Sequence, residues 1–173
     1  GDLYREFVSF SCLQPGTINS LCSTQRNSAL FEECNFGCFN NTCLPPVHDV
    51  ALIDFTGSVQ KIKLELNTTD ILDPLALLEP GAYKISIRAE NQGHFNENIT
   101  FRGKITNDSG AELISFTHNK IDNQEPGEHN DRTKTVDFSI LPGGFYNVSV
   151  DAIIMNDNDI QDNSAVRRIR ISS

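Results

Sequence analysis

Two segments, residues 78–87 (LEPGAYKISI) and residues 141–150 (LPGGFYNVSV), decide the fold. In each of them a Leu precedes a Pro-Gly turn, and a Tyr opens a stretch in which apolar and polar residues alternate. Proline presets φ and glycine supplies the unusual φ of a sharp turn, so both turns are tight. Alternation with period two predicts a half-buried β-strand after each turn.

Tyr83 and Tyr146 follow these turns closely. A Tyr in that position can return its hydroxyl to the loop backbone, which is the tyrosine corner of immunoglobulin-like sandwiches. We therefore expect each hydroxyl to donate a hydrogen bond to the turn before it. The doubled pattern favours a sandwich over other all-β folds.

The same alternation recurs throughout residues 47–173, and Gly, Pro, Asn and Asp separate the alternating stretches. About seven or eight strands at this spacing predict an antiparallel immunoglobulin-like β-sandwich rather than βαβ units. The expected strands are residues 50–55, 62–66, 83–89, 99–105, 113–117, 136–140, 146–154 and 169–171.

Two segments of this body lack a clear pattern. Residues 70–78 are either a short helix that starts at Asp73-Pro74 or an edge segment. Residues 118–132 are expected to form a long polar surface loop. This loop carries ligand-type side chains without metal spacing, namely His118, Glu125, Glu128, His129 and Asp131.

All five cysteines lie in the first 43 residues. A segment of that size rarely folds on its core alone, so we expect disulfides to stabilise it. The chain is thus predicted to have a Cys-rich head over residues 1–46 and a sandwich body over residues 47–173, with Pro45-Pro46 as a stiff spacer. Within the head, residues 4–12 and 29–33 are expected to be strands.

The disulfide candidates are Cys12, Cys22, Cys34, Cys38 and Cys43. Zinc is the less favoured interpretation, because zinc sites prefer Cys-x2-Cys or Cys/His sets. Five is an odd number, so two bridges leave one thiol over. Five choices of that thiol and three pairings of the other four give fifteen connectivities. The remaining thiol is either buried and inert or paired with another subunit.

Clustered cysteines indicate an oxidising, extracellular compartment. N-glycosylation sequons agree with secretion and would mark surface positions. They begin at Asn40, Asn67, Asn98, Asn107 and Asn147.

The net charge of −9 argues against nucleic acid as a partner, because phosphate binding needs clustered Lys and Arg. The only basic run, residues 167–170, is divided between two faces by strand alternation, and we interpret it as a solvated edge strand. No stretch approaches the roughly 18 apolar residues of a membrane span.

The richest acidic stretch is residues 156–163 (NDNDIQDN). Alternating oxygen ligands can surround Ca²⁺, and the candidate ligands here are Asp157, Asp159 and Asp162. The EF-hand pattern, with Gly at its sixth position and a distal Glu, does not occur. Because Asn and Asp also favour turns, a solvated hairpin loop is the plainer interpretation. We expect no cofactor other than this Ca²⁺.

The body resembles the CARDB-type immunoglobulin-like domain of prokaryotic surface proteins. The resemblance rests on residues 49–52 (DVAL), the Pro80-Gly81 turn with its strand to residues 89–93 (AENQG), the second Pro-Gly turn, and Asp162-Asn163 before the last strand. The head, with its Cys34, Gly37, Cys38, Asn41 and Cys43 pattern, resembles Cys-rich segments of secreted archaeal proteins. Together these resemblances imply a non-catalytic module at the cell surface.

No nucleophile elbow, phosphate-binding loop or His-Glu-x-x-His motif occurs, so we predict that the protein is not an enzyme. The favoured function is that of an extracellular structural or adhesion protein that self-associates or joins other surface proteins. A sharper hypothesis is a subunit of a pilus-like filament, in which a free-standing first strand with Phe7, Val8 and Phe10 pairs with the sheet edge of a neighbour. The alternative is an accessory module that binds a glycan or Ca²⁺ within a larger surface assembly.

Overall fold

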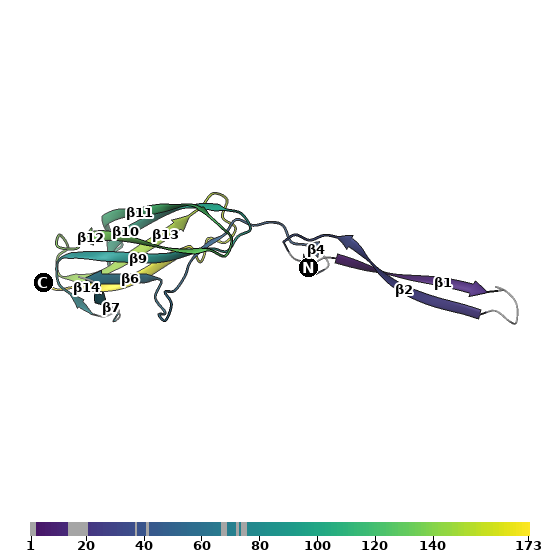
Figure 1. Cartoon of the computed structure of the whole chain (residues 1–173). Helices are drawn as coiled ribbons and strands as arrows, with labels where there is room; N and C mark the ends of the chain where they lie inside the picture. Colours follow the sequence, from purple (N-terminus) through teal and green to yellow (C-terminus); the bar gives the residue numbers. More distant parts are fainter. Residues whose placement is uncertain are drawn as a thin grey trace. The chain divides into compact units, whose positions relative to one another are not determined.

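The chain divides into two compact units, Gly1–Pro46 and Val47–Ser173. The computed structural model (Figure 1) describes residues 3–13, 21–36, 38–40, 42–66, 69–71, 73 and 76–173. All regular elements in these ranges are β-strands, which confirms the all-β fold class. None of the described residues belongs to a helix that is long and apolar enough to cross a membrane.

The first unit is built on a long antiparallel hairpin. Strand β1 (Leu3–Leu13) pairs with β2 (Leu21–Glu32) along its whole length. Two short strands follow, β3 (Cys38–Phe39) and β4 (Thr42–Cys43). The expectation of a free-standing first strand is wrong, because β2 is far longer than the predicted residues 29–33 and occupies one edge of β1.

The second unit is an immunoglobulin-like sandwich of two sheets, seen as two layers of strands in Figure 1. One sheet has the order β12-β9-β6-β7, and β5 also pairs with β9. The other has the order β11-β10-β13-β14-β8. The strands are β5 (Val50–Leu52), β6 (Ile62–Leu66), β7 (Thr69–Ile71), β8 (Leu77–Leu78), β9 (Ala82–Asn91), β10 (Glu97–Asn107), β11 (Glu112–Gln124), β12 (His129–Asp137), β13 (Gly144–Ile153) and β14 (Ser164–Ile171).

Both predicted tyrosine corners are present, one at the start of a central strand in each sheet. The Tyr83 hydroxyl donates to the carbonyl of Glu79 at 2.7 Å, and the Tyr146 hydroxyl donates to the carbonyl of Pro142 at 2.6 Å. Burial raises the pKa of Tyr83, as the charge of Glu79 does to a smaller extent, so its hydroxyl stays a donor. The two corners fix where β9 and β13 begin.

The expected loop at residues 118–132 is wrong. These residues continue β11 and begin β12, and only residues 125–128 form the turn between them. Gly127 has φ +76 there, and its N–H donates to the carbonyl of Asn91 at 2.7 Å. Two buried side-chain amides hold the turn. Gln124 donates to the carbonyls of Ala89 and Glu128, and Asn91 donates to the carbonyl of Gln124. The chain thereby passes from one sheet to the other at this edge.

Other expectations need smaller corrections. The strand expected at residues 50–55 stops at Leu52, and that expected at residues 136–140 ends at Asp137. In the described part of residues 70–78, β7 and β8 are edge strands, which favours the edge interpretation over a helix.

Arg167 closes the opposite side of the sandwich. The side chain is 7% exposed and points inward from β14, while Arg168 and Arg170 are exposed, as the alternation predicts. The interpretation of residues 167–170 as a solvated edge strand is wrong, because Arg167 is buried and β14 lies between β13 and β8. Its guanidinium donates to the carbonyl of Ile62 at 3.0 Å and to the carbonyl of Ile71. These bonds join β14 to β6 and β7 across the open edge of the two sheets.

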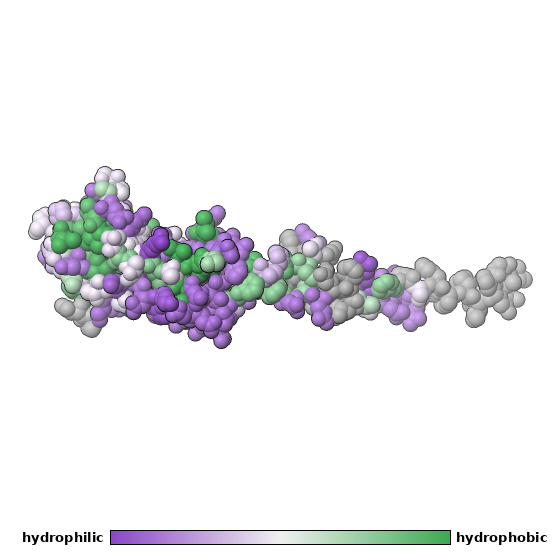
Figure 2. All heavy atoms as spheres, turned by 90° about the horizontal axis from the view of Figure 1, so that it is seen from above, coloured by the Kyte–Doolittle hydropathy of each residue, from purple (hydrophilic) through white to green (hydrophobic). Residues whose placement is uncertain are grey.

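The core consists of the inward residues of both sheets, with Ile, Val, Leu, Phe and Tyr in contact. On the surface of the body, Figure 2 shows hydrophilic residues beside separate hydrophobic patches. The side chain of His118 also lies among these core residues, at 5% exposure. Its Nε2 lies 3.0 Å from the carbonyl oxygen of Ile85, and its ring meets Phe101 and Phe116 edge-on.

We expect Tyr83→Phe and Tyr146→Phe each to lower the free energy of unfolding by about 1 kcal/mol, because each removes one intramolecular hydrogen bond. The corners lie in different sheets, so the double variant should lose about the sum. Urea denaturation of each variant measures this, with Tyr4→Phe in the exposed hairpin as the control. A double variant as stable as the wild type would contradict the role of the corners.

The buried His118 should make stability depend on pH. Burial lowers its pKa below 6.5, and the nearby charge of Lys134 lowers it further, while the hydrogen bond to Ile85 opposes both. In the unfolded chain the ring regains its ordinary pKa, so the unfolded state binds more protons below about pH 6.5. The contribution of the neutral His118 ring to the free energy of unfolding is therefore complete above about pH 6.5. It is lost as the pH falls toward the lower pKa that His118 has in the folded protein.

Thermal unfolding between pH 7.5 and pH 5 tests this, with the wild type compared to His118→Gln, which keeps an N–H donor. We expect the melting temperature of the variant to fall less steeply toward acid. His129→Gln, at an exposed position of β12, is the matched control and should follow the wild type. Parallel curves for all three proteins would exclude His118 as the cause.

Candidate ligand-binding cleft on the outer face of the sandwich

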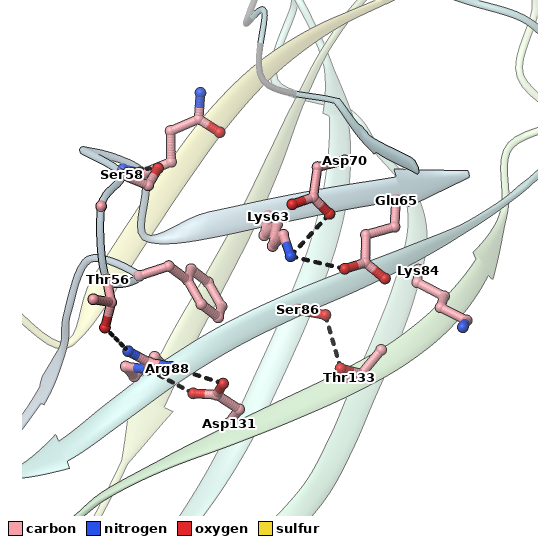
Figure 3. Close-up of a pocket in the computed structure, with 13 residues that line it drawn as sticks. Thr56, Ser58, Lys63, Glu65, Asp70, Lys84, Ser86, Arg88, Asp131 and Thr133 are labelled. Carbon is pink, nitrogen blue, oxygen red and sulfur yellow. Dashed lines mark hydrogen bonds and ion pairs between the residues drawn. The ribbon is translucent and has the colours of Figure 1, made fainter. Parts of the chain in front are cut away.

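A polar cleft of about 660 Å³ lies on the outward face of the β12-β9-β6-β7 sheet (Figure 3). The loop between β5 and β6 forms one wall of it. The lining residues are Phe55, Thr56, Gly57, Ser58, Gln60, Lys63, Glu65, Asp70, Lys84, Ser86, Arg88, Asp131 and Thr133.

Strand alternation and register bring the floor residues together. Every second residue of a strand faces outward, so the cleft-lining residues of β6, β9 and β12 share one face. The register places Lys63 opposite Ser86 and Glu65 opposite Lys84. On the other side of β9, Thr133 lies opposite Ser86, and their hydroxyls are 2.7 Å apart.

The wall loop is held in a fixed conformation. The Ser58 N–H donates to the carbonyl of Phe55 at 2.9 Å, and Gly57 adopts φ +78 between them. A residue with a Cβ is strained at this φ, so glycine suits the turn. The loop thereby presents Phe55 and Thr56 beside the floor.

Arg88 is the centre of the first group of contacts in the cleft. It donates to both carboxylate oxygens of Asp131, at 2.6 Å and 3.0 Å, and to the hydroxyl of Thr56 at 2.9 Å (Figure 3). Its guanidinium carbon lies 5.1 Å from the centroid of the Phe55 ring. The hydrogen bond from Arg88 lowers the pKa of Asp131, so this carboxylate stays ionised.

Lys63 is the centre of the second group. Its Nζ lies 2.9 Å from a carboxylate oxygen of Glu65 and 2.8 Å from one of Asp70. The hydrogen bond from Lys63 lowers the pKa of Asp70, and the bond to Asp70 in turn raises the pKa of Lys63. Lys84 lies on the same face and forms no ion pair with any described residue.

The charges in the cleft balance. Three cations, from Lys63, Lys84 and Arg88, face three carboxylates, from Glu65, Asp70 and Asp131. The cleft therefore offers many oriented hydrogen-bond donors and acceptors without a net charge, and one aromatic ring at its wall.

The predicted metal ligands Asp157, Asp159 and Asp162 lie in the loop between β13 and β14. Asn163 donates to Asp157 Oδ2 at 2.6 Å, and the backbone of the loop is bound to that of His48. In the part of the chain that the structure describes, no three His, Cys, Asp or Glu side chains are grouped so as to hold a metal ion.

Sequence reasoning missed Asp49, which faces this loop. Burial raises the pKa of Asp49, and the charges of Asp162, Asp157 and Asp159 raise it further. Burial likewise raises the pKa of Asp162, and the charge of Asp159 raises it further. Buried Oδ1 atoms of Asp49, Asp162 and Asn163 have no hydrogen-bond partner among the described residues.

One disulfide joins described side chains, between Cys34 and Cys43 with a Cα–Cα distance of 5.0 Å. The side chains of Cys12, Cys22 and Cys38 lie outside the described part of the chain. Backbone register places Cys12 opposite Cys22 and Cys38 opposite Cys43.

The remaining predicted site residues do not gather in one place. Asn98, Asn107 and Asn147 lie on β10 and β13, away from the cleft, and Asn40 lies in the first unit. Asn67 falls outside the described residues. Of the proposed donor residues, Phe7 is 54% exposed in β1, and the side chains of Val8 and Phe10 lie outside the described part.

Two solved structures share the fold of the body at low sequence identity. A CARDB domain from Pyrococcus furiosus, solved in complex with di-metal ions, aligns with a TM-score of 0.50 and 11% identity, over 75% of this chain and 97% of that one. The C-terminal domain of Wzt aligns with a TM-score of 0.54 and 12% identity, over 74% of this chain and 76% of that one. No family model and no curated protein sequence matches the chain.

This likeness confirms the immunoglobulin-like sandwich expected from the CARDB resemblance, and at these identities it shows the fold alone. The archaeal origin and the resemblance of the Cys-rich head stay predictions.

Proposed function

We propose that this protein is an extracellular accessory module that binds a neutral, hydroxyl-rich ligand, a glycan, in the cleft on the β12-β9-β6-β7 face. The observation that carries the proposal is the charge balance of the cleft. A net charge would select an ionic ligand, whereas paired carboxylates and cations in fixed positions suit sugar hydroxyls, which both donate and accept hydrogen bonds.

The geometry of the cleft supports the same ligand class. Arg88 is fixed by both oxygens of Asp131 and by Thr56, so its orientation is set before any ligand arrives. Such preorganisation reduces the entropy lost on binding. Phe55 adds an apolar ring at the wall, against which the apolar face of a sugar ring can pack.

Extracellular localisation rests on the head. The Cys34–Cys43 disulfide suits an oxidising compartment, and a small unit of this kind depends on such bridges. We infer that the protein acts by binding and not by catalysis, because Asp70 and Asp131 each lie within 3.0 Å of a cation whose hydrogen bond lowers the pKa of the carboxyl group.

Native gel electrophoresis through soluble polysaccharides tests the proposal. We expect a neutral polysaccharide, mannan or β-glucan, to retard the protein, and the anionic alginate to leave its mobility unchanged. Removing the central pair with Arg88→Ala/Asp131→Ala should weaken binding at least about tenfold, or about 1.4 kcal/mol.

The matched control is Arg102→Ala/Asp151→Ala, which removes a cation and a carboxylate that lie opposite each other on β10 and β13 of the other sheet. This control should bind like the wild type. Retardation by alginate alone, by none of the three polymers, or equal losses in both double variants would overturn the proposal.

A second candidate function is Ca²⁺ binding at the loop between β13 and β14. The favouring observation is the set of buried, unpartnered oxygens on Asp49, Asp162 and Asn163. A divalent cation would compensate the mutual repulsion that raises the pKa of Asp49 and Asp162. Since these side chains are not grouped around one point, the loop would have to close on Asp49 as the ion binds.

Differential scanning fluorimetry after EDTA treatment tests the second candidate. We expect CaCl₂ to raise the melting temperature within about 10 mM, since extracellular modules bind Ca²⁺ with dissociation constants of about 0.1–1 mM. Asp162→Asn should raise the melting temperature without Ca²⁺, because it removes repulsion, and should abolish the Ca²⁺ response. Asp122→Asn, at an exposed position of β11, is the control. A wild type that ignores Ca²⁺ would exclude the site.

The filament hypothesis is less well supported than either candidate. It assumes a free-standing first strand, whereas β1 pairs with β2 from Leu3 to Leu13. Self-association through the hairpin as a whole stays a hypothesis.

A further inference from the structure

The hairpin of the first unit needs a stabilising element beyond its backbone hydrogen bonds. An isolated two-stranded hairpin is at best marginally stable in water. Residues 24–29 of β2 are exposed, as are Tyr4 and Phe7 of β1, at 64% and 54%. The Cys34–Cys43 bridge closes only the segment after β2.

The backbone register places one pair of cysteines directly opposite each other. Cys12 of β1 faces Cys22 of β2, one position before the hairpin ends at Leu13 and Leu21. Directly opposite residues of an antiparallel pair have Cα atoms about 4.5–5.5 Å apart. This separation falls within the about 4.4–6.8 Å that disulfides span.

Chain length excludes the other pairings of these two cysteines. Cys43 is already bound to Cys34. Cys22 lies ten residues before Glu32 in a continuous strand, which is about 33 Å at 3.3 Å per residue. Cys38 follows Glu32 by six residues, which reach at most about 22 Å. Cys38 therefore lies at least about 11 Å from Cys22, beyond the roughly 7 Å limit of a disulfide. The same separation holds for Cys12, because it lies directly beside Cys22 and equally far along the hairpin from Glu32.

We propose that Cys12 and Cys22 form a second disulfide and that Cys38 is the remaining thiol. In forming this bridge, the two thiols lose two protons and two electrons. The electrons reduce the disulfide of a thiol–disulfide oxidant, as is usual in extracytoplasmic compartments. The bridge joins β1 covalently to β2, so the hairpin can meet a partner only as a two-stranded unit while the bridge is intact.

Non-reducing peptide mapping tests the pairing. The full chain is secreted into a bacterial periplasm, blocked with N-ethylmaleimide under denaturing conditions and digested with trypsin. Cleavage after Arg5, Arg26 and Lys61 separates residues 6–26, with Cys12 and Cys22, from residues 27–61, with the other three cysteines. We expect peptide 6–26 to be lighter by two hydrogens and unlinked, and N-ethylmaleimide on Cys38 alone.

Two results would overturn the proposal: a link between the two peptides, or N-ethylmaleimide on Cys12 and Cys22. Cys38→Ser serves as the control, because it should leave peptide 6–26 closed and remove the only labelled site. Limited trypsin digestion of the folded protein is a second readout. Cys12→Ser/Cys22→Ser should speed cleavage after Arg26 in β2, and an unchanged rate would contradict a stabilising bridge there.

Discussion

The sandwich depends on the hydrogen bonds that two tyrosines donate to the turns before them. Each turn brings the chain into the central region of one sheet, and each hydroxyl is fixed on a carbonyl four residues earlier. Because side chains alternate between faces, the position at which β9 and β13 start decides which residues are buried. Tyr83 and Tyr146 thus help to fix the inward set of both sheets, and with it the outward set that lines the cleft.

The cleft is a consequence of that alternation. Outward residues of β6, β9 and β12 meet in register, and the wall loop adds Phe55 and Thr56. The guanidinium of Arg88 is held in one orientation, because the carboxylate of Asp131, the hydroxyl of Thr56 and the ring of Phe55 all contact it. The polar floor is ordered before any ligand binds, because its charged groups hold one another in place.

The fold was predictable because its signals are local. The two Pro-Gly turns, each followed closely by a Tyr, and the period-two alternation predicted the central strands, the sandwich class and the tyrosine corners. The cleft was not predictable, since it depends on which strands become neighbours. Asp131 was assigned to a loop, and its pairing with Arg88 follows from the register of β12 on β9. Asp49 was missed for the same reason, because its acidic neighbours lie more than 100 residues later in the chain.

The two edges of the sandwich are closed in different ways. On one side the chain itself runs from β11 into β12, so the layers are joined there by covalent bonds. On the other side the inward guanidinium of Arg167 bridges β14 to β6 and β7 through hydrogen bonds, and the chain also crosses between the two sheets from β7 to β8. Loss of this guanidinium would leave the carbonyls of Ile62 and Ile71 without its hydrogen bonds, and the two layers would stay joined at this edge by the chain between β7 and β8 and by side-chain packing.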